Sequence, residues 1–589
     1  MAKLNVIQPH IHPSEVVRGI TARDLEGLNV VFINMPLRET ALPNTTPEGP
    51  LLMATNLIRN YGVSASVIDL NAYRIKDELA QKRGLPRGRH LTEEEAFGKI
   101  QRHFLKFGEP DLVCLSGMIT TLKWQKAVAG MVRRLVPNTM LVSGGGLATE
   151  LKVGLFNYTP ELDGVAHSEG DDVIVKICYD AAVIRRHGRQ HALNSGKLEP
   201  YLLQDGSGRL MYEGDRPDDL DRFPWVDLEL LREDVDGVKI LEQYLQAEAW
   251  GLSANNSSAA PFVTAPKTTS VSSRGCPYGC KYCYRGAQGE RKWHVRSARH
   301  LVEEMKEHMA KYGIAFKSWP DDNFAVTFKR IKELRDIIVA EGIKIPWGTH
   351  TRLDEAGGFV PNSRQPHHER NFFTDYIFED PLRIKLMAEA NCKYVGFGPE
   401  SAHPDTLEEL GKGGFTLKAG LIPVGVNGHT YYFPKAMIYG TKHTMEAGIH
   451  ANMTWIKFNP GETLERLKQT VAFIKWQIDY YATFGIPEEA VNKNMFTLTW
   501  YPGTELINHP KVRLELSRVF GLNFQRINGK WDPVCDEAFY RYCLELDDAT
   551  KLLHGPDGEP LNFSEMPNDL ALQINEYVSS GQTLRILDI

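Results

Sequence analysis

The sequence of 589 residues lacks any apolar run of about 18 residues, the length that a membrane-spanning helix requires. Its first twenty residues lack an apolar core followed by a small-residue cleavage site, which is the pattern of a secretory leader. The apolar share of 42% and the charged share of 24% are those of a globular protein. We therefore expect a cytoplasmic protein with no membrane partner.

An excess of positive charge is absent too. The chain has 68 lysines and arginines against 74 aspartates and glutamates, a formal net charge of −6. Domains that bind nucleic acids usually carry a basic surface that neutralises phosphates. A slightly negative net charge does not provide such a basic surface, so no nucleic-acid partner is expected.

Cysteine is scarce, with eight residues in the whole chain. Disulfides are uncommon in the cytoplasm, and single cysteines in apolar or helical segments usually behave as small buried hydrophobes. We expect this of five of the eight. They are Cys114, Cys178, Cys392, Cys535 and Cys543.

The other three cysteines, Cys276, Cys280 and Cys283, lie within the short stretch "RGCPYGCKYC". A structural zinc site usually takes four protein ligands, often from two C-x-x-C pairs, and the sequence has no second pair. Three thiolates on one tight loop instead suit three irons of a [4Fe–4S] cube. The fourth iron would then be open to a ligand from outside the protein.

Strands and helices alternate from residue 27, after an N-terminal lead over 1–26. Apolar, β-branched runs predict buried parallel strands, and the repeated βα units predict an α/β, doubly wound, Rossmann-like domain over 27–190. Ligands of such sheets bind beyond the carboxyl ends of the strands. The predicted strands are 28–36, 64–70, 110–118 and 139–146.

A mixed region, 191–265, is partly hairpin-like and partly linker-like, and is predicted to connect two domains. The alternation of strands and helices resumes over 266–510, where about six βα units predict a partial or full (β/α) barrel. Its working face is formed by the loops at the carboxyl ends of the strands. Two inserts, 355–378 and 412–440, are expected to cover that face, and 511–589 are expected to be mainly helical.

The motif "RGCPYGCKYC" after a predicted strand resembles the loop that binds the cluster in the radical S-adenosylmethionine (SAM) superfamily. The resemblance extends over 270–510 through "WHVRSARHLVEEM", "PDDNF", "GFGPESAHPDTLEELGKG" and "NPGETLERLKQT". It implies that the three clustered cysteines bind a [4Fe–4S] cluster whose open iron binds SAM. It also implies contacts to SAM from Arg296, Ser297, Asp322, Glu400 and Ser401.

A doubly wound domain ahead of such a barrel resembles a cobalamin-binding domain. The pair together resembles the cobalamin-dependent (class B) radical SAM methyltransferases. The motifs are "LSGM", "VSGGGLATE" and "GVAHSEGDD". A glycine-rich loop by itself fits other nucleotide-type ligands or none, so that alternative stays open. The resemblance implies cobalamin contacts from Ser116, Gly117, Gly144, Gly145, Gly146, Ser168, Glu169 and Gly170.

The sequence departs from classical cobalamin domains at one point. Those domains carry D-x-H-x-x-G, whose histidine is the lower ligand of cobalt, whereas "DLNAYRIKD" has Asn71 at the comparable place. The lower face of cobalt is therefore expected to be open or covered by a group that does not ligate. Candidates are Asn71, Tyr73 and Arg74; an arginine would cover the face without donating a lone pair.

The family resemblance implies transfer of a methyl group from methylcobalamin to an unactivated carbon of a small molecule, such as an intermediate of antibiotic or other secondary metabolism. It implies a [4Fe–4S] cluster, SAM and cobalamin as cofactors, and a flavodoxin or ferredoxin as electron donor. The protein would hold the reactive centres in line and exclude water. The residues single out no catalytic side chain.

Three alternatives remain. A cobalamin-dependent radical oxidase or cyclase would use the same cofactors without methylating its substrate. A transfer-RNA methylthiotransferase would need a cysteine-rich N-terminal domain, but residues 1–190 contain only Cys114 and Cys178. A cobalamin or light sensor would have no use for an iron open to SAM.

Overall fold

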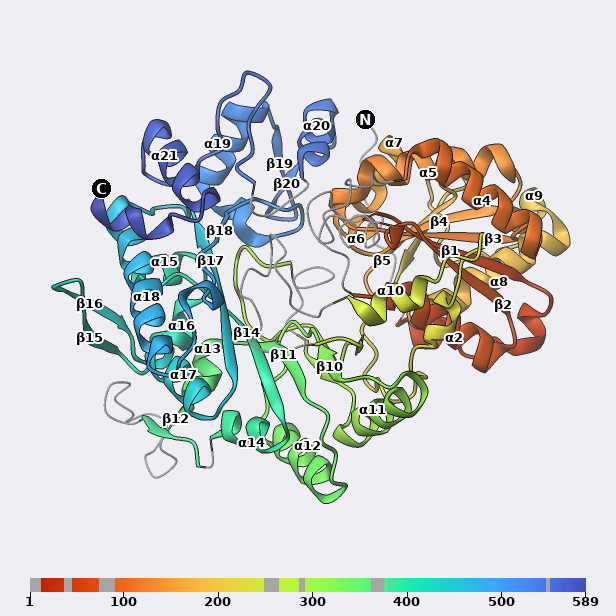
Figure 1. Cartoon of the computed structure of the whole chain (residues 1–589). Helices are drawn as coiled ribbons and strands as arrows, with labels where there is room; N and C mark the ends of the chain where they lie inside the picture. Colours follow the sequence, from red (N-terminus) through yellow and green to blue (C-terminus); the bar gives the residue numbers. More distant parts are fainter. Residues whose placement is uncertain are drawn as a thin grey trace. The chain divides into compact units, whose positions relative to one another are not determined.

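The computed structural model describes residues 12–36, 45–73, 91–247, 264–284, 292–361, 376–380, 382–546 and 551–589. These residues form two compact units (Figure 1). The first lies within Met1–Gln246, Arg285–His294 and Cys535–Asp547, and the second within Ala247–Tyr284, Val295–Val534 and Asp548–Ile589. Within the described residues, no helix is long and apolar enough to cross a membrane.

The first unit is built on a six-stranded parallel sheet with the strand order β2-β1-β3-β4-β5-β6. The order reverses between β1 and β3, so their carboxyl ends mark the switch point at which such sheets bind ligands. The predicted doubly wound fold is confirmed. The strands are β1 (Asn29–Asn34), β2 (Ser64–Asp69), β3 (Leu112–Ser116), β4 (Met140–Gly144), β5 (Gly164–His167) and β6 (Leu210–Glu213).

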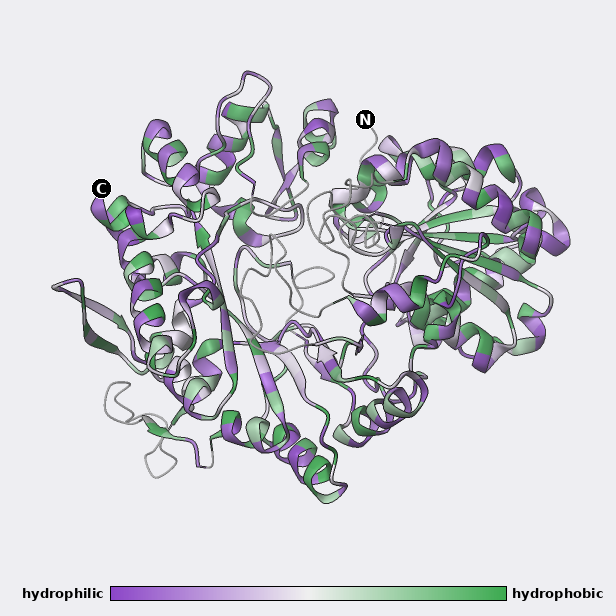
Figure 2. Ribbon diagram, in the orientation of Figure 1, coloured by the Kyte–Doolittle hydropathy of each residue, from purple (hydrophilic) through white to green (hydrophobic). Residues whose placement is uncertain are grey.

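Helices cover this sheet, whose strands are apolar along most of their length, while the helices carry polar outer stripes (Figure 2). Helix α4 packs against α5, and the short η1 (Ala22–Leu25) contacts both α2 and α8. A capping box begins α4, where Thr92 and Glu95 bond each other's backbone N–H. The main helices are α2 (Glu48–Tyr61), α4 (Glu93–Phe107), α5 (Leu122–Leu135) and α8 (Val173–His187), and the shorter ones are α1 (Pro13–Val16), α6 (Gly146–Leu151), α7 (Leu155–Tyr158), α9 (Arg189–Asn194) and α10 (Ile240–Gln246).

The region expected to be a linker over 191–265 contributes structure to the first unit. Strand β6 pairs in parallel with β5, and a short antiparallel bridge joins Leu202 to Leu210, as the hairpin-like sequence predicted. The unit continues to Gln246 rather than ending near residue 190. Sequence patterns missed this boundary because β6 is short and lies at the sheet edge.

The second unit is built on another six-stranded parallel sheet, in which each strand pairs with its neighbours in chain order: β7-β10-β11-β14-β17-β18. Strands β7 and β18 do not pair with each other in the described residues, so the sheet is a partial barrel, one of the two forms predicted. The strands are β7 (Lys267–Thr269), β10 (Phe316–Trp319), β11 (Trp347–Thr351), β14 (Cys392–Glu400), β17 (His450–Lys457) and β18 (Met495–Thr497).

The helices between these strands lie side by side along one face of the sheet (Figure 1). The core between sheet and helices contains the fully buried Trp319, Trp347 and Trp455. Trp319 and Trp347 have ring centroids 5.1 Å apart. The helices are α11 (Ala298–Tyr312), α12 (Phe328–Ala340), α13 (Leu353–Gly357), α14 (Arg383–Glu389), α15 (Pro404–Glu409), α16 (Gly413–Thr416), α17 (Lys435–Glu446) and α18 (Leu464–Ala482).

The described hairpins of the two inserts that were expected to cover the working face pack elsewhere. The hairpin of β15 (Leu421–Val426) and β16 (His429–Pro434) packs on the helices α17 and α18. The hairpin of β12 (Phe359–Pro361) and β13 (Tyr376–Phe378) packs its aromatic rings against Tyr439 of α17. Most of the segment between β12 and β13, including "RQPHHERNFF", lies outside the described residues.

The C-terminal region is mainly helical, as predicted, with α19 (Pro510–Phe520), α20 (Glu537–Glu545), α21 (Asn568–Ser579) and the 3₁₀ segment η8 (Thr583–Asp588). It also contains a small antiparallel hairpin, β19 (Phe524–Ile527) and β20 (Lys530–Pro533). Helix α20 belongs to the first unit, where Tyr540 stacks on Tyr158 with centroids 5.0 Å apart.

Candidate functional site

The three clustered cysteines lie on a loop that follows β8 (Ser273–Arg274), directly after the first strand of the half barrel. The loop folds tightly, with the Cys283 N–H donating to the Cys280 carbonyl at 3.2 Å. Burial raises the pKa of the Cys276 thiol, so this free thiol stays protonated at neutral pH. A metal ion displaces such a proton and supplies the positive charge that a buried thiolate needs.

Asp321 holds the strand that leads into this loop. Its carboxylate accepts the Ser272 N–H at 2.7 Å and also both hydroxyls of Ser272 and Ser273, the latter at 2.6 Å. Arg330 donates to the Ser272 carbonyl at 3.0 Å. Burial raises the pKa of Asp321. The first aspartate of "PDDNF" is therefore an anchor beneath the loop.

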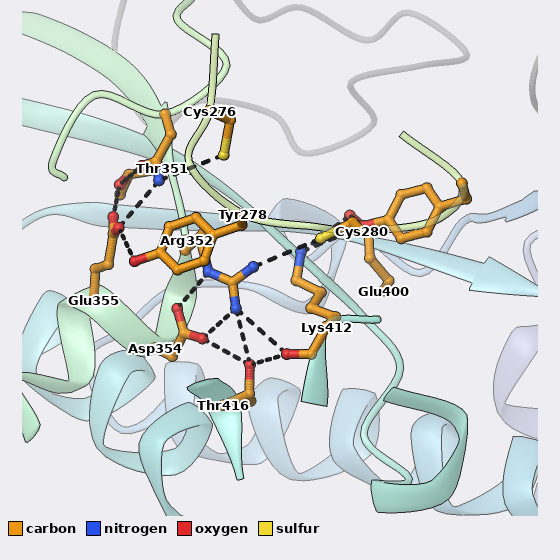
Figure 3. A network of polar contacts seen from close by, with 12 residues as sticks. Cys276, Tyr278, Cys280, Thr351, Arg352, Asp354, Glu355, Glu400, Lys412 and Thr416 are labelled. Carbon is orange, nitrogen blue, oxygen red and sulfur yellow. Dashed lines mark hydrogen bonds and ion pairs between the residues drawn. The ribbon is translucent and has the colours of Figure 1, made fainter. Parts of the chain in front are cut away.

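A second group of polar side chains lies under Cys276. Glu355 accepts hydrogen bonds from Tyr278 at 2.9 Å, Asn323 at 3.0 Å and Thr351 at 2.6 Å (Figure 3). The Asn323 amide is also directed at the Cys276 sulfur, at 4.0 Å. These residues come from three different strand ends, and they place one N–H donor at a cysteine sulfur.

Arg352 lies beside Cys280. Its guanidinium donates to Asp354 through two nitrogens and points Nη1 at the Cys280 sulfur, 3.7 Å away (Figure 3). Thr416 of α16 completes the group by donating to Asp354 at 2.7 Å. The start of the second insert therefore does reach the cysteine loop, although its hairpin does not.

Glu400 ends β14 in a left-handed backbone conformation, with φ of 67°. Its Oε1 accepts the Tyr282 hydroxyl at 3.0 Å and lies 3.5 Å from Lys412 Nζ. Burial and then the Glu400 charge raise the pKa of Tyr282, which keeps the hydroxyl protonated. A carboxylate, an ammonium and a phenol thus meet next to the cysteine loop.

The other predicted SAM contacts lie around the loop in different settings. The Arg296 N–H donates to the Ser272 carbonyl at 3.0 Å, and Ser297 caps α11 by accepting the His300 N–H. Asp322 is exposed.

Ser401 is fully buried, and its neighbour Glu400 in the predicted pair is 9% exposed. Its Oγ lies 3.0 Å from Thr470 Oγ1 and accepts the His403 N–H at 3.1 Å. The hydroxyl thus has protein partners on the helix side of the sheet.

Sequence reasoning did not assign Glu355, Asp354 or Lys412 to the site. Lys412 belongs to the motif "ELGKG", and the two acidic residues follow "HTRL" at a strand end. A rule that takes charged residues within the first turn after every barrel strand would have found Asp354 and Glu355 but not Lys412, which lies beyond α15.

In the first unit, the loops after β3 and β4 touch each other. A Cβ on Gly145 would lie 2.8 Å from the Gly117 carbonyl oxygen, and Gly145 has φ of 81°. The Leu147 N–H donates to the same carbonyl at 3.1 Å. Ser116 and Gly144 end the paired strands β3 and β4 and are partners in register. The sheet thus brings the predicted residues of "LSGM" and "VSGGG" together at its carboxyl edge.

The loop after β5 lies beside them. Ser168 has φ of 71°, and its N–H donates to Thr149 Oγ1 at 3.0 Å. Glu169 forms an ion pair with the buried Arg216, at 3.1 Å. A Cβ on Gly170 would lie 2.7 Å from the sulfur of Met53, so a larger residue there would displace the Met53 side chain.

Asn71 and Tyr73, the candidates for the lower face of cobalt, follow β2. The Asn71 N–H donates to the buried Asp69, which also accepts from Asn34 at 2.8 Å and Tyr244 at 2.7 Å. Tyr73 donates its hydroxyl to Asp234 at 2.6 Å. Arg74 lies outside the described residues.

Comparison with known proteins supports the family predicted from the sequence. Residues 270–474 match the model of the radical SAM superfamily. Over 424 residues, 71% of this chain and 72% of the relative, the sequence is 26% identical to an uncharacterized methyltransferase of Pyrococcus horikoshii.

Two solved structures share the fold. The radical SAM methyltransferase TsrM of Kitasatospora setae, solved with tryptophan and a SAM analogue, has a TM-score of 0.54 at 16% identity, over 93% of this chain and 88% of TsrM. The cobalamin-dependent radical SAM enzyme OxsB, solved with aqua-cobalamin and SAM, has a TM-score of 0.54 at 15% identity, over 86% of this chain. The match spans 63% of OxsB, less than two thirds of its length. Residues 270–474 thus match the radical SAM superfamily, and the chain shares the fold of TsrM and OxsB, two proteins described as radical SAM enzymes.

Proposed function

We propose that the protein is a cobalamin-dependent radical SAM methyltransferase that moves a methyl group to an unactivated carbon of a small molecule, such as an intermediate of antibiotic or other secondary metabolism. The observation that carries this proposal is the loop of three cysteines at the carboxyl edge of a parallel half barrel, in a chain whose first unit is a doubly wound sheet. The relative of Pyrococcus horikoshii and TsrM are both described as methyltransferases.

The cysteine loop fits an iron–sulfur cluster. Cys276, Cys280 and Cys283 supply three thiolates, and two of their sulfurs face N–H donors, from Asn323 and Arg352. Such donors stabilise the negative charge that a cluster places on its ligands. The set of three leaves one iron for SAM.

The group of Glu400, Lys412 and Tyr282 fits the amino-acid end of SAM. Glu400 would accept hydrogen bonds from the amino group, and the Lys412 ammonium would pair with the carboxylate. In the structure the three side chains contact each other at 3.5 Å or less, and these contacts position the Glu400 carboxylate and the Lys412 ammonium in a buried site. Arg296, Ser297, Asp322 and Ser401 remain predictions as SAM contacts.

The first unit offers cobalamin two buried oxygens that have no hydrogen-bond partner in the described part of the chain. They are Gln125 Oε1 and Glu150 Oε2. Gln125 donates to Ser143 of β4, and Glu150 lies on α6, which begins in the glycine-rich loop. The amide side chains of cobalamin are donors that would satisfy such oxygens. This fit supports the prediction that Ser116, Gly117, Gly144–Gly146 and Ser168–Gly170 contact cobalamin.

When bound, these cofactors supply a one-electron cleavage of SAM and a methyl group carried on cobalt, with the electron coming from a flavodoxin or ferredoxin. The residues of the chain bind and orient the cofactors and keep water away from them. Asn71 and Tyr73, which both bond to other protein groups, would cover the lower face of cobalt without ligating it.

The test uses protein purified without oxygen and supplied with iron, sulfide, hydroxocobalamin and SAM labelled in its methyl group. Iron–sulfur and corrin absorption bands together with label on the bound corrin are the expected result. Both sets of bands without label on the corrin, but with 5′-deoxyadenosine formed, would favour a cobalamin-dependent oxidase or cyclase instead. Iron–sulfur bands without corrin bands would contradict the assignment of the first unit.

A further inference from the structure

Arg352 directly follows β11 and is buried, with 6% of its surface exposed. Its Nη1 lies 3.7 Å from the Cys280 sulfur, which is within the range for an N–H group donating to sulfur. A full positive charge thus lies next to one of the three expected ligands of the cluster.

Three neighbours fix the guanidinium in this position. Its Nε and Nη2 donate to the two oxygens of Asp354, at 3.0 and 2.5 Å. Its planar face lies over the ring of Tyr278, 4.1 Å from the centroid. Nη2 also lies 3.3 Å from Thr416 Oγ1. A two-pronged ion pair and a stacked ring hold an arginine far better than a single contact does.

Arg352 and Asp354 lie at different distances from the Cys280 sulfur, with the positive charge nearer to it. Arg352 presents Nη1 to the sulfur, whereas Asp354 binds the other nitrogens of the guanidinium (Figure 3). Because the pair is buried, solvent screens it little, and the positive end is the one next to Cys280.

We propose that Arg352 raises the reduction potential of the cluster, and that Asp354 limits this rise. Reduction adds one electron from an external low-potential donor to the cluster, and no bond or proton changes place. The added negative charge is stabilised by a nearby cation and by an N–H donated to a ligand sulfur, which are two determinants of cluster potentials. Arg352 is thus a tuning residue, acting through Cys280. The inference rests on the proposed function, since it requires that the three cysteines hold a cluster.

The two partners give opposite predictions. Replacing Arg352→Gln removes the cation, so the midpoint potential of the reconstituted cluster should fall. Replacing Asp354→Asn leaves the cation without its counter-charge, so the potential should rise. Arg352→Lys keeps the charge without the planar fork and should lower the potential less than Arg352→Gln does. The measurement is a redox titration of the full-length protein, reconstituted with iron and sulfide without SAM, followed by visible absorption and by the paramagnetic signal of the reduced cluster.

Arg383→Gln is the matched control. Arg383 is also largely buried and forms a two-pronged ion pair with Glu379, but its other hydrogen bonds among the described residues go to the carbonyls of Ala325 and Val326. Its charge acts on Glu355 and Tyr278, and within the described part of the chain no hydrogen bond joins it to a cysteine sulfur, so its loss should lower the potential much less than Arg352→Gln does. A general loosening of the domain would shift the midpoint potentials of Arg352→Gln, Asp354→Asn and this control in the same direction.

Opposite shifts in Arg352→Gln and Asp354→Asn support the proposal. Shifts of the same sign, or no shift in either variant at normal iron content, overturn it. If Arg352→Gln fails to hold iron, Asp354→Asn decides alone: a raised potential supports the proposal, and an unchanged or lowered one overturns it. Wild-type protein that binds no cluster would instead refute the proposed function.

Discussion

Gly411 lies against Gly279 of the cysteine loop so closely that a Cβ on Gly411 would be 2.7 Å from the Gly279 carbonyl oxygen. The Lys281 N–H donates to the Leu410 carbonyl at 2.9 Å in the same place. The segment between α15 and α16 therefore supports the loop from behind by backbone contact. The cysteine loop is shaped by this segment as well as by its own glycines.

Replacing Gly411→Ala should weaken this support. Gly411 has φ of 72°, a conformation that costs an L-residue roughly 1–2 kcal/mol, and the added methyl group would push against the loop. We expect iron bound after reconstitution to fall and the thermal midpoint of unfolding to drop. Gly414→Ala is the control, because a Cβ there meets nothing within 4 Å. Equal iron content in the two variants would show that the loop does not depend on this contact.

Glu400 and Ser401 are neighbours with different surroundings, so they give a paired prediction. Replacing Glu400→Gln keeps the shape of the side chain but removes the negative charge that we propose binds the amino group of SAM. We expect SAM to bind about tenfold more weakly, which corresponds to about 1.4 kcal/mol. The measurement is equilibrium binding of SAM to the reconstituted protein.

Replacing Ser401→Ala should instead affect folding. The buried hydroxyl bonds to Thr470 and His403, and its loss should cost about 1 kcal/mol in the free energy of unfolding. SAM affinity in this variant tests the predicted Ser401 contact. A change of less than twofold would mean that the hydroxyl serves folding alone, and a loss as large as that of Glu400→Gln would support a direct contact.

Much of the fold could be predicted because its signals are local. Apolar strands alternating with helices predicted both parallel sheets, and the cysteine spacing together with the motif order predicted the radical SAM domain. Strand ends such as Ser116 and Gly144 could be paired in advance, since parallel strands place their carboxyl ends at one edge.

What could not be predicted depends on contacts between distant segments. The Tyr73 hydroxyl bonds to Asp234, 161 positions away, in a region expected to be a linker. Helix α20 joins the first unit although segments of the second flank it in the sequence. The hairpin at 421–434 looked suited to covering the site because it is aromatic, yet its Phe433 packs on Phe473 of α18. Periodicity cannot reveal which surface an amphipathic insert will cover.

Glu462 makes the stability of the second unit depend on pH. It is fully buried after β17 and accepts the N–H groups of Phe458 and Asn459, at 2.7 and 3.2 Å. Burial outweighs these donors and raises the pKa of Glu462 from 4.5 to about 7. Between these values the folded state keeps a proton that the unfolded state has lost, so the free energy of unfolding falls as pH rises toward 7 and then levels off.

Replacing Glu462→Gln should remove this dependence. The difference in unfolding free energy between wild type and variant should shift in favour of the variant by about 3 kcal/mol between pH 4.5 and 7. Denaturant unfolding at several pH values measures it. Glu465→Gln is the control, because its side chain is 82% exposed. A difference between wild type and Glu462→Gln that stays constant over this range would mean that the buried carboxyl ionises as it does in water.

Gly145 gives the matching prediction for the first unit. With φ of 81° and the Gly117 carbonyl 2.8 Å from where its Cβ would be, Gly145→Ala should separate the loops after β3 and β4. We expect a loss of about 1–3 kcal/mol in unfolding free energy and weaker binding of hydroxocobalamin, measured from the corrin absorption that remains after gel filtration. Gly130→Ala in α5, where nothing lies within 4 Å of the added Cβ, should stabilise the unit by roughly 0.5–1 kcal/mol and leave corrin binding unchanged. If Gly145→Ala lost stability but bound cobalamin as tightly as wild type, these loops would hold the sheet together without forming the cobalamin site.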